Sequence, residues 1–171
     1  MGLFDRIRGR EADRARDDTA SDTSPAEEGG GTLEGVEPME SIGTRRLTGE
    51  EEAALAQVRE GYAEHGIDPA DLASIAAAYD AALARHDADG DDEQGADAVT
   101  VVGTAIGDHL VAVGGYRWVM STDPFGTDLA VEPPRRGVPV VTRMLVAVRW
   151  LALERDWLVG VTEHLVRLGR S

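Results

Sequence analysis

The chain has 171 residues and no cysteine, which suits one folded domain plus a tail and excludes disulfides, thiol catalysis and thiolate metal sites. Its formal net charge of -15 disfavours nucleic-acid binding, because such binding depends on neutralising phosphates. All 17 basic residues are arginine, a composition that indicates a GC-rich bacterial genome. No single arginine is therefore interpreted as selected for recognition.

Acidic and basic residues are segregated along the chain. Residues 47–98 carry two arginines against 14 acids, and residues 133–171 carry seven arginines against three acids. We expect a basic C-terminal helix to lie across acidic N-terminal helices. Within a monomer, Arg143, Arg149 and Arg155 should then face Glu60, Glu64 and Asp71. Arginines that faced outward would instead favour a homodimer.

Residues 1–46 are predicted to be a disordered acidic tether with a short amphipathic tip. In residues 1–8, Leu3, Phe4 and Ile7 share one helical face, which suits weak peripheral membrane contact or docking to a partner. Residues 9–46 hold few large apolar groups and cannot offset the entropy of ordering. We expect no transmembrane segment and no secretion signal, and hence a cytoplasmic protein.

The rest of the chain, residues 47–169, is predicted to begin with helices. Thr48 stands three residues before Glu51, the spacing of a capping box, and the first helix should end at Gly66. The pair Asp68-Pro69 predicts the start of a second helix that ends at His86. After an acidic loop over residues 87–97, a third helix should run from about residue 98 to residue 113.

The periodicity then changes from helical to alternating. Strands are expected over residues 116–121 and 128–131, joined by the turn Asp123-Pro124-Phe125-Gly126, with a short third strand near residues 138–141. A long C-terminal helix follows from about Thr142 to Leu168, bent near residues 155–156. The predicted fold class is therefore α+β: N-terminal helices, a small antiparallel sheet of two or three strands, and a long C-terminal helix.

No catalytic, cofactor or metal set is expected. The pattern that begins at Asp87 resembles a calcium loop, but Asp92 and Ala98 occupy the positions where an EF-hand needs Gly and Glu. The four histidines have no second histidine one helical turn away. One candidate pocket remains, where the third helix meets the strand pair, and its residues are Asp108, His109, Trp118 and Asp123.

The segment Gly103-x-x-x-Gly107-Asp108-x-Leu110, with Gly115, Trp118, Asp123-x-x-Gly126 and Pro139, resembles an uncharacterised bacterial domain-of-unknown-function family. The resemblance covers about residues 70–168 and implies a helix ending in Gly, a Trp-bearing strand, a tight turn and a final helix. Thr142-Arg143 stands where that family has Lys-Arg. The family implies no enzymatic activity.

Two functions follow as hypotheses. The first is a non-catalytic cytoplasmic protein-interaction module with an unknown protein partner, because the sequence lacks recognisable catalytic machinery and carries a long tether. The alternative is a small-molecule binding or hydrolytic domain that uses the pocket between the third helix and the strand pair. The alternative requires the four candidate side chains to converge, because catalytic partners must come within hydrogen-bond reach.

Overall fold

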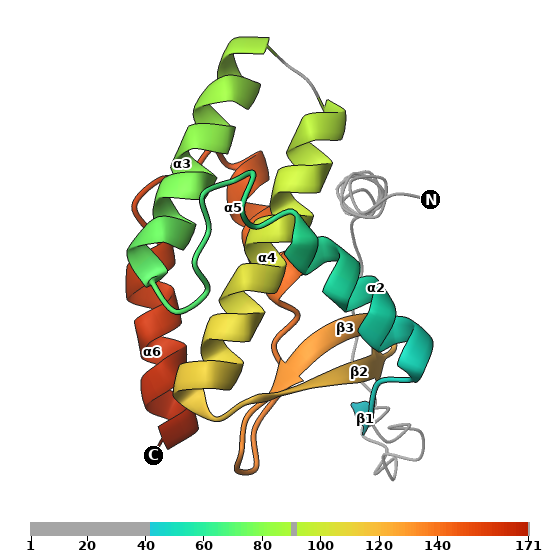
Figure 1. The fold of residues 1–171 in the computed structure, drawn as a ribbon. Coiled ribbons are helices and arrows are strands. Elements are labelled where there is room, and N and C mark those ends of the chain that lie inside the picture. The colour runs from blue at the N-terminus through green and yellow to red at the C-terminus, as the bar shows by residue number, and fades with distance from the viewer. Residues whose placement is uncertain (1–41, 90–91, 171) are drawn as a thin grey trace, which may run out of the picture. The chain divides into compact units, whose positions relative to one another are not determined.

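The computed structural model describes residues 42–89 and 92–170, and almost all of the predicted tether, including its amphipathic tip, lies outside this part. The α+β prediction is confirmed: the described chain has five helices and a three-stranded antiparallel sheet (Figure 1). Within it, α4 (Asp92–Gly114) runs through the centre and contacts the other four helices and the sheet. The core is therefore organised around this one helix.

The first helix, α2 (Gly49–Glu60), begins with the predicted capping box. The Thr48 hydroxyl accepts a hydrogen bond from the Glu51 amide at 3.3 Å, and the Glu51 carboxylate accepts one from the Thr48 amide at 2.8 Å. The next helix, α3 (Leu72–Asp89), starts later than predicted. Residues 68–70 form a turn, and the Asp71 side chain accepts a hydrogen bond from the Ala73 amide at the start of the helix.

The third predicted helix is longer than expected. It begins at Asp92, so much of the predicted acidic loop belongs to the end of α3 and the first turns of α4. By length and composition Glu93–Gly114 could cross a membrane, but 61% of its most apolar stretch is buried inside the protein. Its apolar character is thus explained by its central position, and no transmembrane span is firmly indicated.

The sheet has the order β1 (Gly43–Arg45), β2 (Arg117–Asp123), β3 (Gly126–Glu132). The β2–β3 hairpin was predicted, but the third strand was predicted wrongly at residues 138–141. There Val140 forms only an isolated bridge with Val131, since Pro139 has no N–H to donate to a ladder. The third strand is β1, from residues that the sequence assigned to the tether.

The C-terminal region is helical as predicted, but it is two shorter helices with an interruption at the predicted bend. The chain forms α5 (Thr142–Leu151) and α6 (Leu158–Arg170), separated by a loop in which Leu153 and Asp156 have φ values of 51° and 60°. This break lets the rings of Trp150 and Trp157, on either side of it, pack edge-on against Tyr79 at 5.9 and 5.6 Å. The Tyr79 hydroxyl also donates a hydrogen bond to the Glu154 carbonyl, which fixes the loop to α3.

The basic C-terminal region meets the acidic helices only in part. Helix α6 packs against α3, as expected. Arg149, however, lies over the Trp157 ring at 4.5 Å and 3.8 Å from Glu154, both in its own part of the chain. Within the described residues, Arg143, Arg149 and Arg155 form no ion pair with the predicted partners Glu60, Glu64 and Asp71. The predicted internal pairing is therefore wrong.

Candidate functional site

Asp108 is the centre of a hydrogen-bonded cluster that joins α2, α4 and β2. Its Oδ2 accepts from Arg59 Nε at 2.8 Å and from the Tyr62 hydroxyl at 2.8 Å. Its Oδ1 accepts from Arg59 Nη2 at 2.5 Å and from Trp118 Nε1 at 2.9 Å. Four donors therefore satisfy both carboxylate oxygens, and we call this set of four residues the Asp108 cluster.

The electrostatics of this cluster favour a structural role. Burial, the largest single influence, raises the pKa of Asp108, but the hydrogen bonds from Arg59, Trp118 and Tyr62 together outweigh it, so the pKa lies below its ordinary value. Burial, followed by the Asp108 charge, raises the pKa of Tyr62. The aspartate thus stays ionised and the tyrosine stays protonated, which suits neither as a general acid or base near neutral pH.

The other two residues of the predicted pocket, His109 and Asp123, are not part of the Asp108 cluster. The His109 side chain is buried, and its Nδ1 lies 2.9 Å from the Pro69 carbonyl, which can only accept, so Nδ1 carries the proton. Asp123 lies at the exposed hairpin turn and accepts hydrogen bonds from the amides of Phe125 and Gly126. Of the four predicted residues, the structure brings Asp108 and Trp118 into direct contact, whereas His109 and Asp123 make separate structural contacts.

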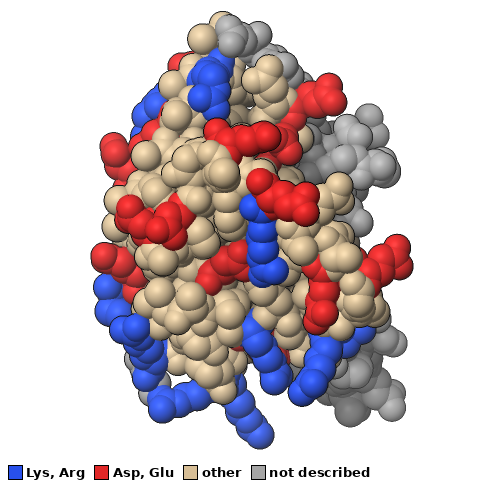
Figure 2. All heavy atoms as spheres, in the orientation of Figure 1, with Lys and Arg blue, Asp and Glu red and all other residues tan. Residues whose placement is uncertain are grey.

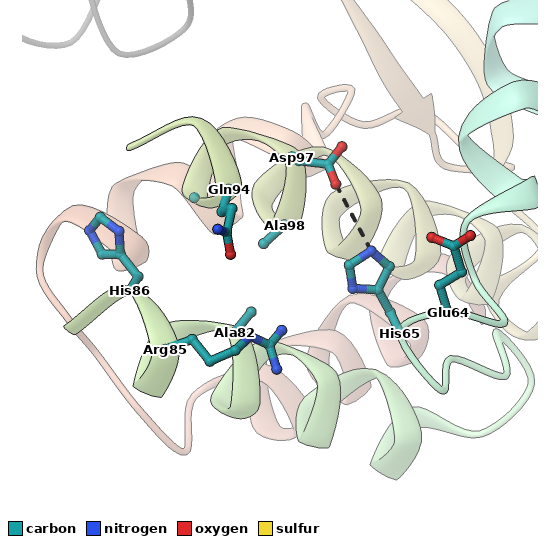
Figure 3. A pocket seen from close by; sticks show the side chains of 9 residues that line it. Glu64, His65, Ala82, Arg85, His86, Gln94, Asp97 and Ala98 are labelled. Atoms are coloured by element: carbon teal, nitrogen blue, oxygen red, sulfur yellow. Dashed lines mark ion pairs between the residues drawn. The ribbon is translucent and has the colours of Figure 1, made fainter. Parts of the chain in front are cut away.

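A small polar cavity lies between α3 and α4, as Figure 3 shows. It measures about 220 Å³, and the small residues Ala82, Gly95 and Ala98 leave the room for it. His65 and Asp97 face each other across one side, with His65 Nε2 3.9 Å from the Asp97 carboxylate. Arg85 also lines it and forms no ion pair with any described residue. The sequence did not indicate this cavity, because its walls come from α3, α4 and the segment between α2 and α3.

A more open groove lies beside the Asp108 cluster. Its first part, of about 640 Å³, is lined by residues of α2, β2 and the segment between β1 and α2: Arg46, Leu47, Glu52, Leu55, Arg59, Arg117 and Trp118. A second hollow of about 460 Å³ shares Arg117 and is further lined by Gly115, Glu132, Pro133, Pro134, Arg135 and Arg136. We call the two together the arginine groove.

The arginine groove is the basic part of an acidic protein. Figure 2 shows arginine side chains gathered at the lower end of the molecule, with acidic side chains spread over the part above. Two groove arginines are already paired, Arg59 with Asp108 and Arg117 with Glu132. The other three, Arg46, Arg135 and Arg136, form no ion pair with any described residue. The groove therefore presents three cations to an incoming group.

No metal centre is evident in the described part of the chain, where no three histidine, aspartate or glutamate side chains gather as ligands would. Comparisons with protein families, with characterised proteins and with solved structures find no match.

Proposed function

We propose that this protein is a non-catalytic cytoplasmic interaction module that binds another protein through the arginine groove. The observation that carries the proposal is the set Arg46, Arg135 and Arg136, three exposed arginines with no ionic partner among the described residues. Arg46 lines the first hollow, Arg135 and Arg136 line the second, and the two hollows share Arg117. Acidic groups are plentiful in this chain, so the lack of pairing at this end leaves the positive charge available to a partner.

The charge distribution supports an acidic protein as that partner. A local positive surface on a body of net charge -15 attracts acidic groups only in one orientation, which gives specificity. A long nucleic acid would meet the acidic remainder of the surface as well, and is disfavoured. Since exposed charges are screened over about 10 Å at 0.1 M salt, binding should weaken as salt rises.

The test compares two sets of charge reversals in the full-length protein. One variant carries Arg46→Glu, Arg135→Glu and Arg136→Glu in the groove, and the matched control carries Arg85→Glu and Arg155→Glu, which are also exposed and unpaired among the described residues. We expect wild type and control to capture the same acidic protein from native cytoplasm at low salt, and the groove variant to lose it. Equal capture by all three proteins would refute the proposal.

A second candidate, small-molecule binding, is supported by the cavity between α3 and α4. Its wall combines Arg85, which has no ion pair among the described residues, with His65 and Asp97, which face each other. The cavity therefore suits a small ligand that carries one positive and one negative group. This cavity is not the pocket that the sequence predicted around Asp108. That pocket is unsuited to catalysis, because both Asp108 carboxylate oxygens already accept hydrogen bonds. A thermal-shift screen of free amino acids tests this candidate. An amino acid that raises the melting temperature of the wild type but not of Arg85→Ala would support it. If no amino acid raises the melting temperature, the candidate is refuted.

A further inference from the structure

The edge of the sheet is open where it enters the arginine groove. Strand β1 pairs with β2 only at Met120, Ser121 and Thr122. After Arg45 the chain leaves the sheet and turns into α2. On this side of β2, the residues from Arg117 to Val119 therefore have no neighbouring strand among the described residues.

The backbone of Trp118 presents hydrogen-bonding groups to this open edge. Val131 lies opposite Trp118 in the β2–β3 register, and it exchanges two backbone hydrogen bonds of 2.9 Å with Val140, on the side away from β2. In an antiparallel pair the two opposed residues either bond each other or both point outward. The Trp118 N–H and C=O must therefore point away from β3, and no described residue bonds to either group.

Three properties thus meet at the first hollow: a strand edge with a free donor and acceptor, the unpaired Arg46, and open space. Arg135 and Arg136 line the second hollow, which shares Arg117 with the first. Trp118 itself lines the groove together with Leu47 and Leu55, which add apolar surface beneath the edge. An extended peptide satisfies a strand edge through its own backbone, whereas a nucleic acid has no peptide groups to offer. The arginines add a preference for carboxylate side chains.

We infer that the arginine groove takes an extended acidic segment of the partner protein as an additional strand beside β2, in line with β1. This inference rests on the proposed interaction function and specifies the conformation and chemistry of what is bound. One residue of the segment exchanges two backbone hydrogen bonds with Trp118, and flanking carboxylates pair with Arg46, Arg135 and Arg136.

The experiment titrates full-length protein with a short capped peptide in which Glu and Val alternate. A matched peptide has the same side chains but N-methylated amides, which removes its backbone donors, and a third replaces Glu by Lys. We expect the Glu peptide to bind and the Lys peptide not to bind. N-methylation should weaken binding about tenfold or more, since backbone hydrogen bonds are lost. The Trp118 amide should exchange more slowly with solvent in the complex.

The outcomes separate this inference from the proposed function. Equal affinity for the parent and N-methylated peptides, or an unchanged Trp118 amide, would overturn strand addition, while loss of the native partner in the groove variant would still support the interaction module. Capture of the partner by the groove variant would overturn both. A single-stranded oligonucleotide that bound as tightly as the Glu peptide would overturn the assignment of a peptide ligand.

Discussion

Removing the Asp108 carboxylate tests whether the Asp108 cluster holds the fold together. In Asp108→Ala, Arg59 loses its ion pair, and the donors of Tyr62 and Trp118 lose their acceptor. The Arg59 side chain is 40% exposed, so water replaces much of its interaction and we assign about 1 kcal/mol to that pair. The other two hydrogen bonds to a charged acceptor contribute about 1 kcal/mol each after partial rehydration. The expected loss is about 3 kcal/mol of unfolding free energy.

Urea denaturation followed by tryptophan fluorescence measures this loss. Asp97→Ala is the matched control, because Asp97 is also on α4 but is exposed and makes only a 3.9 Å contact with His65. Its effect should stay within about 0.5 kcal/mol. Asp108→Asn keeps an acceptor oxygen and should fall between the two. A loss below about 1 kcal/mol for Asp108→Ala would refute the structural role of the cluster.

Three further predictions concern single contacts and pH. Gly107→Ala should cost about 1–3 kcal/mol in urea denaturation, because its Cβ would overlap the Trp118 ring, whereas Gly160→Ala has open space and should be neutral or stabilising. Thr48→Ala should cost about 1 kcal/mol by removing the cap of α2, and an unchanged midpoint would contradict that role. Acid titration should destabilise the fold below about pH 4, since hydrogen bonds lower the folded-state pKa values of Asp108 and of Glu51, the latter to about 2. Their stabilisation is present above the unfolded pKa and is lost as pH falls, so Asp108→Asn should flatten this profile; an unchanged profile would contradict the assignment.

Sequence reasoning succeeded where a few neighbouring residues determine the structure. The capping box of α2 and the turn of the β2–β3 hairpin both depend on side chains that bond amides two or three residues away. The two features that the fold prediction missed were not determined by a few neighbouring residues. Strand β1 pairs with a strand more than seventy residues later. The interruption between α5 and α6 was predicted only as a bend near residues 155–156, because it contains neither Gly nor Pro to mark a complete break.

The same distinction applies to the candidate site. The alternative hypothesis required Asp108 and Trp118 to meet, and they form a direct hydrogen bond. Arg59 and Tyr62 were missed because they precede Asp108 by 49 and 46 residues, and only the packing of α2 on α4 brings them close. One weak signal existed: Arg59 is one of only two arginines among the 14 acids of residues 47–98, so an acidic partner was to be expected.

The Asp108 cluster also bears on the proposed binding surface. Arg59 and Trp118 both belong to the cluster and both line the arginine groove, so the carboxylate that has no free oxygen for chemistry fixes two side chains of the groove wall. The Trp118 ring also packs closely on Gly107, the neighbour of Asp108 on α4. A wall fixed before binding loses less conformational entropy when a ligand arrives. Under the proposed function, the partly buried aspartate would serve recognition indirectly, by keeping the edge of β2 and its indole in one position.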